Sequence, residues 1–169
     1  DRESIWSALK KKEVYGTSGP RILLWFDLLD EGTVVPMGTE VEMREAPVLR
    51  VRAVGSFEQA PGCPTDAIEA LGADGVERLC GGECYHASDV RRPITRIDVV
   101  RIRPQAEPDE PIASLIDDPW KTFECPPDPA GCIATFIDDD YPTAARDTVY
   151  YARAFEAPIP TVNGDPLSC

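Results

Sequence analysis

Positive charge is scarce in this sequence. The chain has 17 lysines and arginines against 30 aspartates and glutamates, and its formal net charge is −13. A nucleic-acid partner requires a basic surface that neutralises phosphates, and an anionic membrane surface attracts clusters of basic residues. We therefore expect neither nucleic acid nor a membrane among its partners.

Long apolar runs and histidine are also scarce. No apolar stretch reaches the roughly 18 residues that a transmembrane helix needs. No secretory signal peptide is visible, although a processed chain would have lost one. His86 is the single histidine, and the neighbouring Cys84 has no orienting partner in view. The sequence therefore supports neither a Ser-His-Asp nor a Cys-His arrangement for nucleophilic catalysis.

Proline is abundant by contrast, and it divides the chain into short segments. The 17 prolines favour strands and ordered loops over long helices. With 169 residues and 43% hydrophobic residues, the chain is long enough to bury a core. No internal repeat is present.

Apolar spacing predicts one helix followed by a series of strands. Ile5, Ala8 and Leu9 follow the i, i+3, i+4 spacing of a helix, and Trp6 lies beside them. Leu49, Val51 and Ala53 alternate as on a strand with one buried face. The strands expected are 14–17, 22–28, one within 47–56, one between Pro93 and Pro104, a hairpin of 120–125 with 131–139, and one within 146–158.

This order of elements predicts a mainly β protein that closes into an immunoglobulin-like or fibronectin-like sandwich. The tyrosine-rich segment "TVYYARAF" is similar, by analogy, to a late strand of such sandwiches. A long insertion at 56–93 interrupts the sandwich and holds a short helix, about 65–71. The residues after 158 are too rich in proline to return along the sheet. We therefore expect an incomplete edge beside 148–155, which either pairs with a second copy in a homodimer or is covered by a loop.

The six cysteines lie among turn residues, and this favours disulfides over a metal cluster. A hairpin around "PPDPAG" would bring Cys125 and Cys132 within disulfide distance. Cys63 is expected to pair with Cys80 or Cys84 and thereby staple the insertion. Disulfides imply an oxidising compartment, so we expect an extracytoplasmic protein, periplasmic or secreted.

Two metal sites remain as alternatives. The stretch "CGGECYH" offers three soft ligands, Cys80, Cys84 and His86, but no obvious fourth ligand. The stretch "IDDDYP" has a calcium-like composition, yet three consecutive aspartates cannot all face one ion from a strand. Pairing of the cysteines elsewhere and a strand end followed by a turn are the plainer interpretations.

Two basic stretches could bind anions. In "GTSGPR", backbone N–H groups together with Thr17, Ser18 and Arg21 could form an anion-binding turn, although the segment lacks the end of a P-loop. The alternative is a tight connection that needs glycine conformations. A second group of arginines could bind carboxylates or phosphates, or could form ion pairs within this acidic chain. Its members are Arg91, Arg92, Arg96 and Arg101.

Three stretches, "ESIWSALKKKEVYGTSGPRI", "ERLCGGECYHASDVRRPITRIDVVRIRPQ" and "DTVYYARAFEAPIPTVNGDPL", together resemble the C-terminal part of a large bacterial family of unassigned function. That family is grouped with the PHP-type metal-dependent hydrolases. The resemblance implies that residues 1–30 are the terminal helix and strand of a PHP-like barrel and that 31–169 form a C-terminal domain. It also implies a divalent metal in the intact protein, held by histidines and aspartates that are not in this chain.

Two functions follow as expectations. The first is an accessory, non-catalytic region of a PHP-like metal-dependent hydrolase, whose partner is the barrel domain upstream in the same polypeptide. The second is an extracytoplasmic binding or interaction module for carbohydrate or protein. This chain has no catalytic residue, no metal ligand and no cofactor of its own under either hypothesis, so its status as an enzyme stays open.

Overall fold

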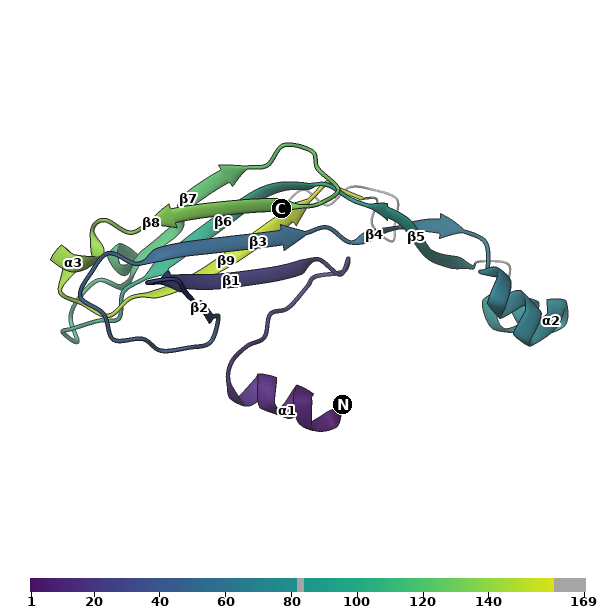
Figure 1. Ribbon diagram of the computed structural model, residues 1–169, viewed down its shortest axis with the longest axis horizontal. Coiled ribbons are helices and arrows are strands. Elements are labelled where there is room, and N and C mark those ends of the chain that lie inside the picture. Colours follow the sequence, from purple (N-terminus) through teal and green to yellow (C-terminus); the bar gives the residue numbers. More distant parts are fainter. Residues whose placement is uncertain (82–83, 160–169) are drawn as a thin grey trace.

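The computed structural model describes residues 1–81 and 84–159, and it is mainly β (Figure 1). A four-stranded antiparallel sheet has the order β2-β1-β3-β8, and a three-stranded one has the order β7-β6-β9. In the first sheet the strands are β1 (Leu23–Asp30), β2 (Thr33–Pro36), β3 (Val48–Val54) and β8 (Cys132–Ile137). In the second they are β6 (Ile94–Ile102), β7 (Ile116–Glu124) and β9 (Val149–Glu156).

The two sheets pack face to face around one hydrophobic core. Val51 and Ala53 on β3 are completely buried, and Leu49 is 5% exposed. They meet Ile97 and Val99 of β6 from the opposite sheet, both also completely buried. The alternation predicted for β3 is thus confirmed, and the strand expected between Pro93 and Pro104 is β6.

Strand β1 belongs to this four-stranded sheet. It pairs with β3 from Leu23, opposite Val54, to Leu29, opposite Val48. Leu24 and its neighbours at period two pack against the core. Residues 23–30, which the expected boundary assigns to a separate barrel, therefore lie in the same sheet as β3. The division of the chain at residue 30 stays a prediction. The strand expected at 14–17 is wrong, since that segment has no regular structure.

The hairpin predicted for 120–125 and 131–139 is also wrong. Strand β7 pairs with β6, whereas β8 pairs with β3, so the two strands lie in different sheets. Their aromatic residues face each other across the core: the ring centroids of Trp120 and Phe136 are 5.9 Å apart. The disulfide Cys125–Cys132, with a Cα–Cα distance of 5.8 Å, consequently joins the two sheets. The expected pairing is present, but it bridges the sheets where a hairpin was predicted.

The insertion forms an arm that projects from the sheets (Figure 1). It consists of β4 (Phe57–Pro61), α2 (Thr65–Cys80) and β5 (Tyr85–Arg91), and β4 pairs only with β5 among the described strands. Helix α2 is longer than predicted and breaks at Gly72, whose φ of 66° is non-helical. Cys63 pairs with Cys84 at a Cα–Cα distance of 5.0 Å, so Cys84 is the partner among the two that the sequence left open.

Hydrogen bonds fix the base of the arm to the two packed sheets, which are called the body below. The Arg92 backbone N–H donates to the Ser56 carbonyl oxygen at 2.8 Å. The Glu156 carboxylate at the end of β9 accepts from both the backbone N–H and the hydroxyl of Ser56, each at 2.9 Å. A Cβ on Gly55 would overlap the Arg92 carbonyl oxygen. The two segments that connect the arm to the packed sheets therefore lie in contact with each other.

The remaining helices are short. Helix α1 (Arg2–Lys10) precedes the sheets, the 3-10 turn η1 (Ile112–Leu115) precedes β7, and α3 (Tyr141–Ala144) follows β8. Within the described residues, no helix is both long enough and apolar enough to cross a lipid bilayer. Strand β9 pairs with β6 alone among the described strands, and the expectation for residues 160–169 concerns a segment outside the described residues.

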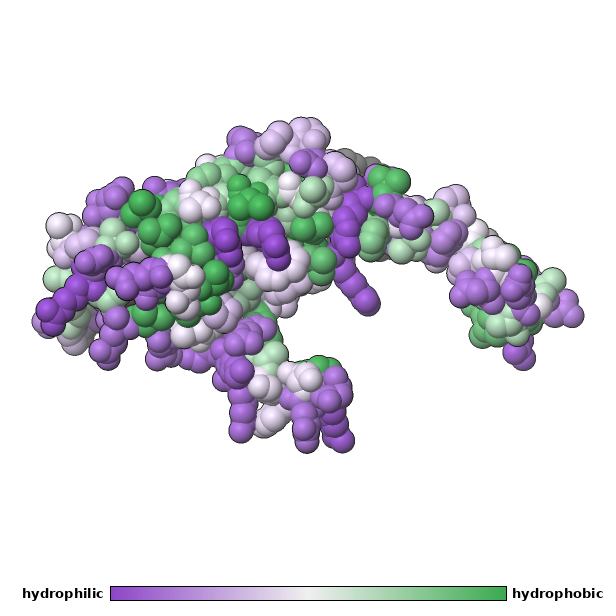
Figure 2. Space-filling model, viewed as in Figure 1, coloured by the Kyte–Doolittle hydropathy of each residue, from purple (hydrophilic) through white to green (hydrophobic). Residues whose placement is uncertain are grey.

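The side of the four-stranded sheet that faces away from the core is called the outer face below. One row across it aligns Trp25, Arg52 and Ile133, and another aligns Leu29, Val48 and Ile137. Asp27, Arg50 and Thr135 lie in the row between them. Figure 2 shows this side, where hydrophobic patches over the sheet are separated by hydrophilic side chains.

Candidate functional site

The anion-binding turn predicted from "GTSGPR" is an exposed segment. Thr17, Ser18 and Arg21 all have exposed side chains. Gly19 has a φ of 134°, a conformation that favours glycine, as the tight connection requires. Anion binding by this turn stays a prediction.

The soft-metal site proposed from "CGGECYH" is not formed. Cys84 is bound to Cys63 in a disulfide. The His86 Nδ1 lies 2.8 Å from the Gly62 carbonyl oxygen, so this nitrogen must carry the proton and donate it. The side chain of Cys80 lies outside the described residues. The two disulfides indicate an oxidising, extracytoplasmic environment.

The group of arginines divides among separate partners instead of forming one patch. Arg91 donates to the Gly55 carbonyl oxygen at 2.8 Å and lies over the Phe57 ring. Arg96 pairs with Asp98 at 3.2 Å. The alternative of ion pairs within the chain therefore holds for Arg96 and, more strongly, for the buried Arg101.

Arg101 is the centre of a buried charge network at the end of the sheets next to α3. The side chain of this residue of β6 is 7% exposed, and its Nη1 donates to Asp138 Oδ1 at 2.9 Å. Its Nε donates to Asp117 Oδ2, also at 2.9 Å, and its guanidinium lies 4.4 Å from the centroid of the Trp120 ring. Asp138 is 1% exposed, and it accepts a second hydrogen bond from the Tyr150 hydroxyl at 2.7 Å.

The environment of the network shifts two pKa values. Burial alone would lower the pKa of Arg101, but its hydrogen bonds with Asp117 and Asp138 outweigh the burial and raise it. The pKa of Tyr150 is strongly raised, first by burial and then by the hydrogen bond to the Asp138 carboxylate. The guanidinium therefore stays charged and the phenol neutral.

Asp138 of the "IDDDYP" stretch belongs to this network. Asp138 is held by Arg101 and Tyr150, and its Oδ1 also accepts from the backbone N–H of Asp140 at 3.2 Å. Strand β8 ends at Ile137 and α3 begins at Tyr141, as the plainer interpretation required. Across 1–81 and 84–159, no group of three His, Cys, Asp or Glu residues is placed to hold a metal ion.

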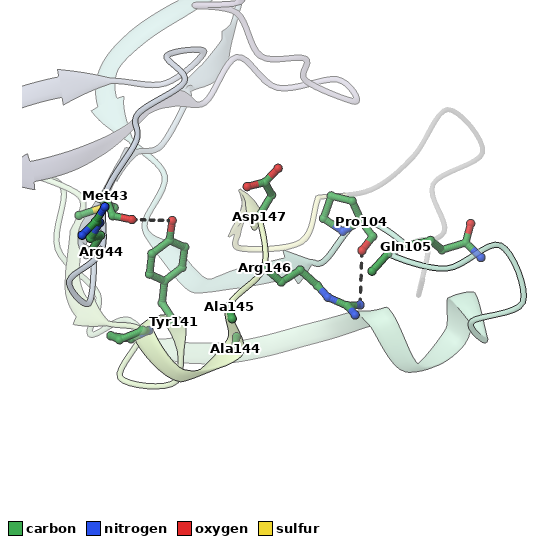
Figure 3. Close-up of a pocket in the computed structure, with 11 residues that line it drawn as sticks. Met43, Arg44, Pro104, Gln105, Tyr141, Ala144, Ala145, Arg146 and Asp147 are labelled. Carbon is green, nitrogen blue, oxygen red and sulfur yellow. Dashed lines mark hydrogen bonds between the residues drawn. The ribbon is translucent and has the colours of Figure 1, made fainter.

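A cleft of about 690 Å³ opens beside α3, at the same end of the sheets (Figure 3). Its walls come from three segments that are distant in sequence: the loop before β3, the loop after β6 and the residues from α3 to β9. This volume lies within the roughly 300–1,000 Å³ of small-molecule sites. The lining residues are Met43, Arg44, Pro104, Gln105, Ala106, Tyr141, Pro142, Ala144, Ala145, Arg146 and Asp147.

Two of the walls of this cleft, here called the α3 cleft, are fixed by hydrogen bonds. The Tyr141 hydroxyl donates to the Met43 carbonyl oxygen at 3.4 Å (Figure 3). Arg146 donates to the Pro104 carbonyl oxygen at 3.4 Å and to Glu110 Oε1 at 2.7 Å. The hydrogen bond from Arg146 is the main cause that lowers the pKa of Glu110. The left-handed Ala145, with a φ of 46°, turns the chain between these two residues.

The lining suits binding better than catalysis. The Tyr141 ring and the Met43 side chain offer apolar surface, and Arg44, Gln105 and Asp147 offer one cationic, one amide and one anionic group. Such a mixture fits a small polar ligand that has an apolar face. No residue of this lining forms a nucleophile and base pair.

Sequence reasoning missed the α3 cleft because its walls converge only in the folded chain. The stretch "DYPTAARD" contains Tyr141, Arg146 and Asp147, but nothing in its spacing points to the loops at Met43 or Pro104. The unusual backbone at Ala145 gives no sequence pattern either, since alanine is not a typical left-handed residue.

In the comparisons with known proteins, only the N-terminal segment of the chain has a match. Residues 1–27 match the model of a family described as a protein of unknown function, DUF3604. These residues contain α1, the segment that follows it and residues 23–27 of β1. No curated protein and no solved structure matches the chain. The match does not reach the two later stretches that resemble the PHP-related family, so that part of the resemblance stays a prediction.

Proposed function

We propose that the chain is an accessory, non-catalytic module that docks through α1 on another folded domain of the same polypeptide. In the form that the resemblance implies, this domain is a PHP-like metal-dependent hydrolase, and the two packed sheets are an immunoglobulin-like or fibronectin-like sandwich attached to it. Under this proposal the divalent metal and the hydrolytic chemistry belong to the docked domain.

The exposed apolar side of α1 carries the proposal. Ile5 is 66%, Trp6 61% and Leu9 55% exposed, and no residue of the helix is buried. A helix of nine residues is marginal in water unless its apolar face is packed. A cover for this face would explain why the segment is helical, and α1 lies within the residues that match the family model.

A substitution at the centre of the apolar side tests the docking. In a polypeptide that includes the proposed docked domain, Ile5→Asp should lower Tm, because a charge replaces a packed apolar side chain. In the 169-residue chain alone, the same substitution should leave Tm unchanged. Acrylamide quenching of Trp6 should likewise be strong in the chain and weak in the longer polypeptide.

Ser7→Asp is the matched control, because Ser7 lies on the opposite side of α1 and the added charge is the same. It should leave Tm unchanged in both proteins. Equal effects of Ile5→Asp on the two proteins, or a Trp6 that stays open to acrylamide in the longer polypeptide, would refute the docking of α1.

The α3 cleft favours a second candidate, an extracytoplasmic module that binds carbohydrate or a similar small polar ligand. Its support is the pairing of the Tyr141 ring with polar groups in a cavity of suitable size. A glycan array followed by calorimetry tests this function. Binding that Tyr141→Ala abolishes would favour it, and binding that Tyr141→Ala leaves unchanged would exclude the cleft as the site.

A further inference from the structure

Two surfaces outside the α3 cleft lack a partner in the described residues. The first is the outer face of the four-stranded sheet, and the second is α2 at the tip of the arm. A sheet with one face in water is expected to alternate apolar and polar residues. Both surfaces instead expose several apolar side chains, and single exposed residues would need no explanation.

The outer face is apolar and carries a positive charge. Ile133 is 65% exposed and Ile137 42% exposed. Arg50 is paired with Asp27 at 2.9 Å, whereas the described residues provide no carboxylate for Arg52. The Arg52 guanidinium lies 4.0 Å from the centroid of the Trp25 ring. Arginine and tryptophan are the residue types that most often dominate binding energy at interfaces.

Helix α2 has the complementary character. Ile68 is 46%, Leu71 48% and Leu79 63% exposed, and no described side chain of the helix is buried. Figure 2 shows hydrophobic and hydrophilic residues side by side at the tip of the arm. Helix α2 contains four acidic residues and one basic residue, Arg78. The acidic residues are Asp66, Glu69, Asp74 and Glu77.

We propose that α2 of one copy packs against the outer face of a second copy of this chain. The apolar side chains of α2 would cover Trp25, Ile133 and Ile137, and its carboxylates would face Arg52. Charge complementarity selects this pairing, because the outer face is locally cationic in a chain whose net charge is −13. The proposal is independent of the docking of α1.

The arm gives the contact a plausible geometry. Its base is fixed by the hydrogen bonds of Ser56 with Arg92 and Glu156, while α2 stands clear of the sheets (Figure 1). A helix held away from its own body can reach the body of another copy. If both copies exchange arms about a two-fold axis, the same contact forms twice, as in most homodimers.

Sedimentation velocity over a range of protein concentrations measures the association. The chain should dimerise, and Arg52→Glu should weaken the association constant about tenfold or more, since it opposes the carboxylates of α2. The double variant Glu69→Arg, Glu77→Arg should weaken it similarly. Circular dichroism verifies that each variant is folded, and Arg52→Gln replaces Arg52→Glu if the latter does not fold.

A mixture of the two variants gives the decisive result. In a one-to-one mixture, each acidic surface faces a basic one, so the heterodimer should form although neither variant dimerises well alone. Lys11→Glu is the matched control, because it changes the net charge by the same amount as Arg52→Glu and lies at the end of α1, outside both surfaces. It should leave dimerisation unchanged.

Each contrary outcome overturns the proposal. A chain that stays monomeric at all concentrations shows that the two surfaces do not meet. A dimer that resists both charge reversals uses another contact, such as pairing at the edge of β9. A dimer that is weakened by Lys11→Glu but not by Arg52→Glu would place α2 against α1 of the second copy instead of against its outer face.

Discussion

The two disulfides should contribute to stability in the opposite order from the lengths of the loops that they close. Cys63 and Cys84 are 21 residues apart, and Cys125 and Cys132 are 7 apart. The entropy lost by the unfolded chain predicts about 3.3 kcal/mol for the longer loop and about 2.4 kcal/mol for the shorter one. This estimate assumes that each disulfide acts on a part that unfolds with the whole domain.

The structure supports that assumption only for the shorter loop. Cys125 and Cys132 join the two sheets, and Cys132 is 9% exposed in the core cluster. Cys63 and Cys84 lie in the arm, whose helix has no buried described side chain. Opening of the arm therefore leaves the core intact, and the stabilisation by Cys63–Cys84 is confined to the arm.

Thermal unfolding of two double variants, followed by near-ultraviolet circular dichroism, measures the difference. Cys125→Ala with Cys132→Ala should lower Tm by about 5–10 °C, the shift expected for about 2.4 kcal/mol in a domain of this size. Cys63→Ala with Cys84→Ala should lower Tm by less than about 2 °C. The arm of the second variant should instead become sensitive to protease. If the second variant loses as much Tm as the first, the arm unfolds together with the core and the reasoning is refuted.

Four further results are expected. Arg101→Met should destabilise the fold by about 3–5 kcal/mol in urea unfolding, since it leaves Asp138 buried and without its cation; a loss below about 1 kcal/mol would contradict this role. Unfolding free energy should fall above about pH 10, by up to about 1.4 kcal/mol per pH unit, because the raised pKa of Tyr150 keeps the folded phenol neutral while the unfolded one ionises. Tyr150→Phe should remove this component, and an unchanged pH dependence would show that other groups cause it. Gly55→Ala should increase amide exchange at the base of the arm, where its Cβ meets the Arg92 carbonyl, and unchanged exchange would show that the backbone adapts. The 169-residue chain should not hydrolyse phosphate or carboxylate esters with Zn²⁺ or Mn²⁺, and a metal-dependent activity that survives further purification would refute the accessory role.

Local periodicity predicted most strands of the two packed sheets but not their partners. The alternation of Leu49, Val51 and Ala53 is enough to identify a strand with one buried face, because burial follows period two. The same kind of pattern in 120–125 and 131–139 led to a hairpin that does not exist. The position of Phe136 in the alternating sequence pattern is the same whether its aromatic neighbour lies on the adjacent strand or on the opposite sheet. The pattern therefore does not identify the partner strand.

Contacts between distant segments were the least predictable part. Asp138 meets Arg101 and Tyr150 only after three strands have been placed, so the sequence could not reveal the ion pair and left calcium as an alternative. The Cys125–Cys132 disulfide could be predicted from the sequence, because the short sequence separation of the two cysteines limits the choice of partners. The α3 cleft and the outer face depend on which loops and strands become neighbours, and no local pattern encodes that.

The contact between Ser56 and Arg92 at the base of the arm has a consequence for how this fold can vary. Two chain segments 36 positions apart already meet there through a backbone hydrogen bond of 2.8 Å. Everything between them could be cut out and replaced by a tight turn without moving β3 or β6. The arm is therefore a position where evolution or protein engineering can replace one inserted segment by another while the sequence of the core stays the same.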